Sequence, residues 1–191
     1  FPTVHPAHPA RLTEWEQHEL DGLVRAFTES EHLQRHVQFL YAKGAVYKVC
    51  NGNLLYHGAV PMTEDGSFAA ETFEGKSYAG KALFDYCDRR ARAGYFAAPG
   101  SPQRQAGQDF LWYLWCGRLS PIFGRSAMTT FERLYIADKA THAEVKNPYY
   151  RHIQSAETAD RILREFGLSG EGCHIINGHV PLRAIEGESP V

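Results

Sequence analysis

The sequence lacks an apolar stretch of the roughly 20 residues that a membrane-spanning helix requires. It also lacks a basic segment followed by an apolar one near its start, so no secretory signal is visible. Positive charge is not in excess, because 20 Lys and Arg residues stand against 22 Asp and Glu residues and the formal net charge is −2. Such a balance does not favour nucleic acid or an anionic membrane as a partner. We therefore expect no nucleic-acid partner and no membrane association.

Cysteine is scarce as well. The four residues are widely spaced and form no CxxC pair: Cys50, Cys87, Cys116 and Cys173. This pattern argues against a zinc knuckle or a disulfide framework and favours the reduced thiols of a cytoplasmic protein. The chain opens at Phe1 without a methionine and stops at Val191 without an obvious terminator, so we expect it to be a piece of a longer protein.

The first 44 residues predict a lead-in followed by two helices. Three prolines in residues 1–12 indicate an extended start. Thr13 and Glu16 have the spacing of a capping box, which predicts the beginning of a helix. A second helix is expected from Ser30 to Gly44, and the pair is interpreted as a helical hairpin.

Residues 45–191 predict a separate α/β domain. The alternating AVYKVC and LLYHGAV segments flank an Asn-Gly turn, which is typical of a β-hairpin. A helical and aromatic insertion is expected at about 78–150, with a helix at 78–98, a loop over APGSPQRQAGQ and a buried DFLWYLWCG segment whose Trp112, Tyr113 and Trp115 fill the core. A helix at 156–166 and a buried strand in CHIINGHVP follow. Helices alternating with strands indicate the α/β class.

Two segments end in similar ways. LLYHGAVP (54–61) and HIINGHVP (174–181) each place a histidine beside a glycine after an apolar run, with a proline following. Strand ends are where ligands bind in α/β sheets, glycine allows close approach, and neutral imidazole binds Mn, Fe or Zn. His57 and His179 are therefore candidate metal ligands. Tyr56 and Asn177 stand close to them and would orient them or touch substrate, and His174 is assigned a structural or supporting role.

Several segments together resemble the bacterial class III fructose-1,6-bisphosphatases, which are built on a calcineurin-like metallophosphatase core. The resemblance runs from about residue 33 to the end and rests on NGNLLYHGAVP, YAGKALFDY, DFLWYLWCGRLSPIFGR, MTTFERLYI, KNPYY, HIINGHVP and GESP. It implies part of a metallophosphatase-type β-sandwich flanked by helices.

The resemblance also implies a metal site. Metallophosphatases hold two metal ions with five motifs, and YHGAVP and NGHVP match the fourth and fifth of them. By that match His57 and His179 are ligands of one of the two ions. The first three motifs, D-x-H, G-D-x-x-D-R-G and G-N-H-E, have no counterpart here. The expected cofactor is Mn²⁺, with Mg²⁺, Fe or Zn as alternatives.

The activity that the resemblance implies is hydrolysis of fructose 1,6-bisphosphate to fructose 6-phosphate and phosphate, in gluconeogenesis. A sugar bisphosphate requires positive charge for its second phosphate, and the candidates are Arg118, Arg125 and Lys139. The parent protein is expected to be active, and a homo-oligomer is compatible with the sequence. This 191-residue piece is expected to be inactive or nearly so, because it lacks the first metal-binding motifs. The alternatives are a non-catalytic α/β interaction or regulatory module and a phosphatase of another metallophosphatase family.

Overall fold

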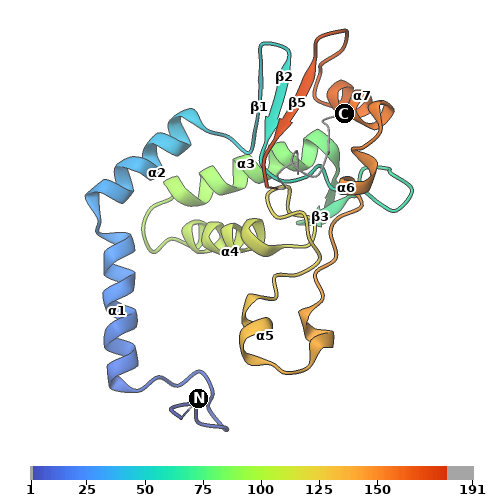
Figure 1. Cartoon of the computed structure of the whole chain (residues 1–191). Helices are drawn as coiled ribbons and strands as arrows, with labels where there is room; N and C mark the ends of the chain where they lie inside the picture. The colour runs from blue at the N-terminus through green and yellow to red at the C-terminus, as the bar shows by residue number, and fades with distance from the viewer. Residues whose placement is uncertain (1, 180–191) are drawn as a thin grey trace. The chain divides into compact units, whose positions relative to one another are not determined.

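A computed structural model describes residues 2–179 of the chain (Figure 1). Val180 and Pro181 of the HIINGHVP segment and the GESP segment at 187–190 lie outside the described residues. The chain divides into two compact units, residues 1–44 and residues 45–191. No helix among the described residues is both long and apolar enough to cross a membrane.

The first unit contains helices α1 (Glu14–Thr28) and α2 (Glu31–Lys43). The capping box is present, since Thr13 Oγ1 accepts a hydrogen bond from the Glu16 backbone nitrogen and the Glu16 carboxylate accepts one from the Thr13 nitrogen. Ser30 caps α2 by accepting a hydrogen bond from the Leu33 backbone nitrogen, without a reciprocal bond. The helices follow one another end to end rather than packing side by side as a hairpin would, and neither contains a buried residue (Figure 1).

The second unit is organised around a three-stranded sheet in the order β1-β2-β5. Strands β1 (Tyr47–Cys50) and β2 (Asn53–Tyr56) are antiparallel, and the Asn51-Gly52 turn between them has positive φ at both residues, as the predicted hairpin requires. Strand β5 (His174–Asn177) pairs with β2 in parallel. A separate two-stranded sheet contains β3 (Glu71–Phe73) and β4 (Lys76–Tyr78).

Two long helices of this unit pack closely against each other at a pair of glycines. In α3 (Gly80–Phe96) and α4 (Pro102–Cys116), a Cβ placed on Gly94 would lie 2.3 Å from the Gly107 Cα. The loop predicted over APGSPQRQAGQ is wrong for most of its length, because Ser101 caps α4 and Pro102 occupies its first turn, where proline loses no hydrogen bond.

The expectation that the tryptophans of α4 fill the core is also wrong. Trp112 and Trp115 lie three residues apart on one helix face and are 65% and 51% exposed. Phe110 and Leu114 instead occupy the buried face of α4, where Phe110 packs edge-on against Tyr86 of α3. Aromatic density alone therefore did not indicate which face of the helix is buried.

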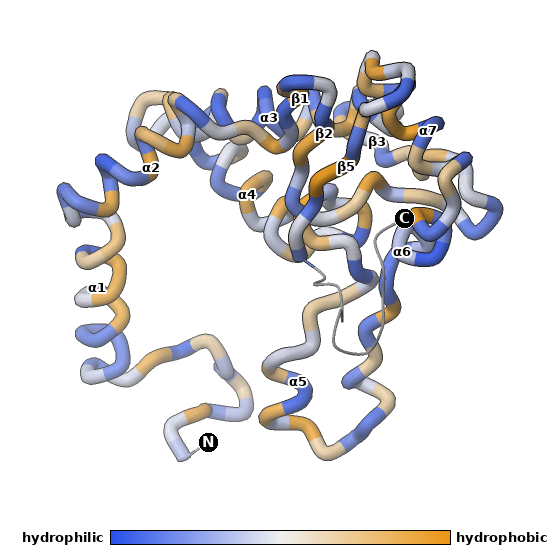
Figure 2. The backbone as a smooth tube through the Cα atoms, turned by 45° about the horizontal axis from the view of Figure 1, so that its top comes forward, coloured by the Kyte–Doolittle hydropathy of each residue, from blue (hydrophilic) through white to orange (hydrophobic). Residues whose placement is uncertain are grey.

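The remaining elements are short, apart from one helix that closes the core. They are α5 (Thr130–Tyr135), the 3₁₀ helix η1 (Lys139–His142), α6 (Tyr149–His152) and α7 (Ala156–Glu165). The core joins β2, α3, α6 and α7 through Leu54, Phe84, Tyr149, Ile162 and Phe166. Figure 2 shows hydrophobic stretches along β2 and β5. Leu54 and Tyr56 of β2 belong to the core, whereas in β5 only Ile175 packs against it and Ile176 is 53% exposed, so the prediction of a buried strand there is wrong.

The α/β class predicted from the sequence is confirmed. The metallophosphatase-type β-sandwich stays a prediction, since the described residues form one three-stranded and one two-stranded sheet.

Candidate metal site at two strand ends

His57 and His179 lie beside each other although 122 residues separate them. His57 directly follows β2, and His179 comes two residues after β5. Because β2 and β5 are parallel and Tyr56 pairs with Asn177, the two strands end at the same end of the sheet. The Nδ1 atom of His179 lies 3.2 Å from the Nε2 atom of His57, and the rings meet edge to face with centroids 5.1 Å apart.

The two glycines beside the histidines allow this approach. The Gly178 nitrogen donates a 3.1 Å hydrogen bond to the His57 carbonyl oxygen, and a Cβ on Gly178 would lie 3.4 Å from His57 Nδ1. Gly58 is more tightly enclosed, because a Cβ there would lie 2.5 Å from the carbonyl oxygens of both Pro121 and Ile122. His179 itself has a φ of 61°, a left-handed conformation that costs free energy and is found preferentially at functional sites.

The electrostatic environment favours a neutral His179. Partial burial lowers the pKa of His179, and the neighbouring His57 and the positive charge of Arg125 lower this pKa further. Neutral imidazole is the form that binds metal ions.

The nitrogen atoms of His57 and His179 are placed so that both could bind the same metal ion. Zinc-bound histidine nitrogens lie about 2.0–2.1 Å from the ion, so two nitrogens 3.2 Å apart are at a separation that one ion can bridge. Within residues 2–179 no group of three or more His, Cys, Asp and Glu side chains is arranged around a common point. The described residues therefore supply two ligands and do not complete a metal site.

Tyr56 and Asn177, predicted as supporting residues, share a partner that the sequence analysis did not single out. Tyr149 is fully buried, and its hydroxyl lies 2.6 Å from the Tyr56 hydroxyl and 3.0 Å from Asn177 Nδ2. The KNPYY segment was noted for its resemblance alone, and a buried Asn-Pro-Tyr turn has no periodicity that reveals it. His174, by contrast, begins β5 opposite Asn53, at the other end of the strand pair from the two histidines.

Of the three candidate phosphate-binding cations, the structure brings Arg125 close to the histidines. Arg125 follows Gly124, and a Cβ on Gly124 would lie 3.2 Å from the Cβ of Ala59, two residues after His57. Arg118 and Lys139 are exposed, and Lys139 is the first residue of η1, which follows α5 in the chain. Neither of them forms a hydrogen bond or ion pair with the two histidines among residues 2–179.

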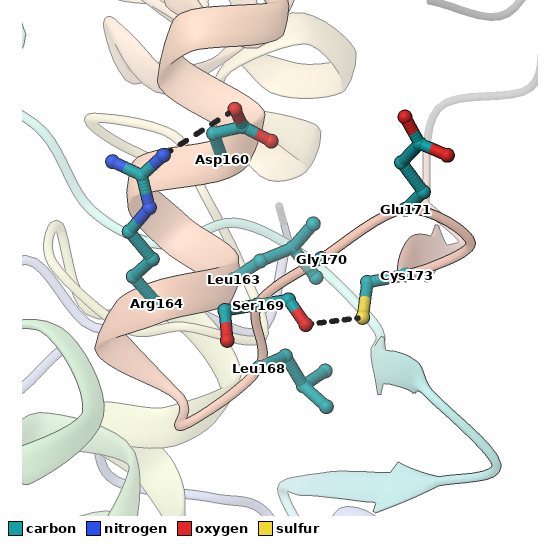
Figure 3. Close-up of a pocket in the computed structure, with 8 residues that line it drawn as sticks. All are labelled: Asp160, Leu163, Arg164, Leu168, Ser169, Gly170, Glu171 and Cys173. Atoms are coloured by element: carbon teal, nitrogen blue, oxygen red, sulfur yellow. Dashed lines mark hydrogen bonds and ion pairs between the residues drawn. The ribbon is translucent and has the colours of Figure 1, made fainter.

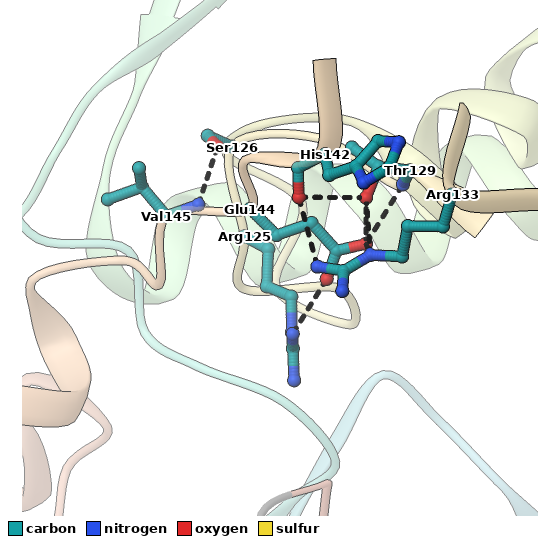
Figure 4. Close-up of polar contacts among 7 residues, drawn as sticks. All are labelled: Arg125, Ser126, Thr129, Arg133, His142, Glu144 and Val145. Carbon is teal, nitrogen blue, oxygen red and sulfur yellow. Dashed lines mark hydrogen bonds and ion pairs between the residues drawn. The ribbon is translucent and has the colours of Figure 1, made fainter. Parts of the chain in front are cut away.

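A carboxylate fixes the position of Arg125 (Figure 4). Glu144 accepts a 2.8 Å hydrogen bond from Arg125 Nη1, and it also accepts bonds from the backbone nitrogen and the hydroxyl of Thr129. Arg133 ties the same loop together by donating to Thr129 Oγ1 and to the His142 carbonyl oxygen. The guanidinium is thus held by a network that spans residues 125–144.

A cavity of about 320 Å³ lies elsewhere in this unit (Figure 3). It is lined by the end of α7 and by the loop that leads into β5, including Arg164, Ser169, Glu171 and Cys173. Cys173 precedes the first residue of β5, so the cavity lies at the opposite end of that strand from His179. Neither His57 nor His179 lines it.

Comparisons with known proteins agree on one family. A family model described as Firmicute fructose-1,6-bisphosphatase matches residues 1–191. A class 3 fructose-1,6-bisphosphatase of Clostridium novyi is 48% identical over 191 residues, and proteins with the same name from Bacteroides fragilis and Fusobacterium nucleatum are 47% and 48% identical. The matches cover the whole of this chain but 29%, 29% and 30% of the three relatives. No solved structure matches.

Proposed function

This chain belongs to the Firmicute fructose-1,6-bisphosphatase family, and on that premise we propose that a protein containing it hydrolyses fructose 1,6-bisphosphate to fructose 6-phosphate and phosphate. Apart from family membership, the main support for this activity is the 3.2 Å distance between His179 Nδ1 and His57 Nε2. A reaction of gluconeogenesis in the cytoplasm is consistent with the four cysteines, all of which are free thiols.

The proposal assigns His57 and His179 as ligands of Mn²⁺, with Mg²⁺, Fe or Zn as alternatives. A bound divalent ion polarises a phosphoryl group and lowers the pKa of water, which is the chemistry that a slow phosphate-ester hydrolysis requires. The lowered pKa of His179 supports this assignment, because it favours the neutral imidazole, which is the form that binds metal ions. The remaining ligands would come from outside residues 2–179.

The proposal assigns Arg125 to a phosphate of the substrate. Its side chain is 32% exposed, so it is both reachable and held in place by Glu144. A planar guanidinium binds phosphate oxygens in a bidentate manner, which suits a sugar bisphosphate. Arg118 and Lys139 are also proposed as phosphate-binding residues. Both are exposed, and among the described residues no hydrogen bond or ion pair with the candidate metal ligands supports this role.

The 191 residues are proposed to have little or no activity without the rest of a protein of the relatives' length. The described residues offer two metal-binding nitrogens, and two ligands do not hold a catalytic ion or pair of ions in place.

The experiment measures phosphate release from fructose 1,6-bisphosphate with Mn²⁺, using the whole protein, its His179→Ala variant and a His36→Ala variant. His36 is an exposed residue of α2 and serves as the matched control. We expect His179→Ala to remove most of the activity without unfolding the protein and His36→Ala to leave it unchanged. Unimpaired activity of His179→Ala would remove His179 from the site. A whole protein inert towards this substrate would refute the proposed function and favour the interaction module.

A further inference from the structure

Tyr149 joins the two strand ends that present the histidines. Its hydroxyl lies 2.6 Å from the hydroxyl of Tyr56, the residue before His57, and 3.0 Å from Nδ2 of Asn177, two residues before His179. Tyr56 and Asn177 are themselves paired in the β2–β5 register. The buried hydroxyl oxygen of Tyr149 therefore contacts the last residue of both strands, β2 and β5.

Contacts of the Tyr149 backbone and ring fix the position of its hydroxyl oxygen. The Asn147 side-chain oxygen accepts hydrogen bonds from the backbone nitrogens of both Tyr149 and Met62. The Asn147 backbone nitrogen donates to the Gly124 carbonyl oxygen at 2.9 Å. The Tyr149 ring also packs edge-on against Tyr56 and Tyr150. A side chain restrained at its backbone and along its ring holds its hydroxyl in one place.

The donors and acceptors around this hydroxyl form one consistent set. The Gly58 carbonyl oxygen can only accept, and it lies 3.5 Å from Asn177 Nδ2, which assigns the nitrogen of that amide to the inner side. Asn177 therefore donates to the Tyr149 hydroxyl, which remains free to donate to Tyr56. Burial raises the pKa of both tyrosines, so both hydroxyls keep their protons at neutral pH.

We propose that Tyr149, whose ring packs against Tyr56 at the end of β2, is a positioning residue: its hydroxyl holds the end of β5 through Asn177, and so sets the separation of His57 and His179. The choice of a metal ion as the ligand that depends on this separation rests on the proposed function. Groups that orient metal ligands from behind contribute strongly to affinity, because a displaced ligand binds poorly.

The test compares two variants that delete the same tyrosine–tyrosine hydrogen bond. Tyr149→Phe removes the contacts to both Tyr56 and Asn177, whereas Tyr56→Phe leaves the contact between Tyr149 and Asn177 in place. Mn²⁺ is titrated into the whole protein, and the free ion is measured by electron paramagnetic resonance. We expect Tyr149→Phe to weaken Mn²⁺ binding about 10- to 100-fold. We expect Tyr56→Phe to weaken it by less than about threefold at a comparable melting temperature.

A double-mutant cycle identifies the route. If Tyr149 acts through Asn177, Asn177→Ala weakens Mn²⁺ binding to a similar extent, and the double variant binds no more weakly than either single variant. Wild-type affinity in Tyr149→Phe would overturn the proposal, as would equal losses in Tyr149→Phe and Tyr56→Phe or fully additive losses in the cycle.

A metal-free measurement separates this proposal from the proposed function. In protein with isotope-labelled histidine, ring protons of His57 and His179 should give a nuclear Overhauser cross-peak in the wild type that Tyr149→Phe loses. If the whole protein binds no Mn²⁺ but shows this pattern, the metal assignment fails and the positioning role stands. A cross-peak that persists in Tyr149→Phe overturns the positioning role whatever the activity.

Discussion

The backbone nitrogen of Ala59 donates a 2.9 Å hydrogen bond to the carbonyl oxygen of Pro121, which anchors the chain leaving β2 onto the SPIFG loop. The contact is close because Gly58 separates Ala59 from His57, and no side chain intervenes. The same loop leads to Gly124 and Arg125. One backbone contact therefore connects the metal-ligand candidate to the phosphate-ligand candidate.

This contact predicts different costs for the two glycines of the site. In Gly58→Ala the new Cβ would lie 2.5 Å from two carbonyl oxygens, and in Gly178→Ala it would lie 3.4 Å from His57 Nδ1, an ordinary contact distance. We expect Gly58→Ala to lower the free energy of unfolding by about 1–3 kcal/mol or more and Gly178→Ala by at most about 0.5 kcal/mol. Thermal denaturation of both variants measures this, and equal melting temperatures would contradict the close packing at Gly58.

The environment of Tyr150 predicts that removing its hydroxyl does not lower the stability of the fold. Its hydroxyl is buried and has no hydrogen-bond partner among residues 2–179, whereas the Tyr47 hydroxyl donates a 2.8 Å bond to Asp85. An unpaired buried hydroxyl is unfavourable, so Tyr150→Phe should leave the melting temperature unchanged or raise it. Tyr47→Phe should lower the free energy of unfolding by about 1 kcal/mol. A melting temperature that falls in Tyr150→Phe as much as in Tyr47→Phe would show that the Tyr150 hydroxyl has a partner.

Local signals in the sequence predicted the elements that contain them. The capping box at Thr13, the Asn-Gly turn between β1 and β2 and the helix predicted at 156–166 each depend on neighbouring residues, and the structure confirms all three. The His-Gly and Gly-His endings predicted one shared site, and the structure brings the two histidines together. That they bind a metal ion stays a prediction.

The parts that the sequence did not reveal depend on tertiary contacts. The α4 helix begins in a Pro- and Gln-rich stretch that a single sequence does not mark as helical. Gly107 lies inside this helix because α3 packs so closely against it at Gly94 that a side chain would not fit. Tyr149 and Glu144 have no motif, and each acquires its role from partners far away in the sequence, Asn177 and Arg125. Burial at such positions follows from the fold, which is why single-sequence reasoning missed them.

Glu144 predicts a pH dependence. The hydrogen bond from the Thr129 nitrogen lowers the pKa of Glu144 below its ordinary value of 4.5, and the Thr129 hydroxyl and Arg125 add to this effect, while burial opposes it. Because the folded state binds the proton more weakly than the unfolded state, this group stabilises the fold above pH 4.5, and that contribution is lost as the pH falls through the folded pKa. In Glu144→Gln, we expect the free energy of unfolding at pH 7 to fall by about 1–2 kcal/mol and to depend less on pH in the acidic range.

Glu64→Gln is the matched control for that measurement. Glu64 also pairs with an arginine, Arg151, but its side chain is 80% exposed, so its loss should change the free energy of unfolding by less than about 0.5 kcal/mol. Melting temperatures at pH 7 and pH 4 compare the two variants with the wild type. If Glu144→Gln loses stability on acidification as steeply as the wild type, Glu144 does not contribute to the pH dependence.

Arg125 and Glu144 form one ion pair, and substituting each in turn separates binding from structure. Arg125→Gln removes the cation, whereas Glu144→Gln breaks the same 2.8 Å contact and leaves the cation in place. If Arg125 binds a phosphate of fructose 1,6-bisphosphate, Arg125→Gln should raise the KM of the whole protein about tenfold or more, with a smaller change in kcat. Glu144→Gln should raise the KM less, because the guanidinium remains available although it is held less firmly. Lys76→Met, an exposed lysine of β4, serves as the neutral control for lost positive charge. Equal KM values in Arg125→Gln and Glu144→Gln would mean that the pair acts by holding the 125–144 loop, and the phosphate would then have to be bound by another cation.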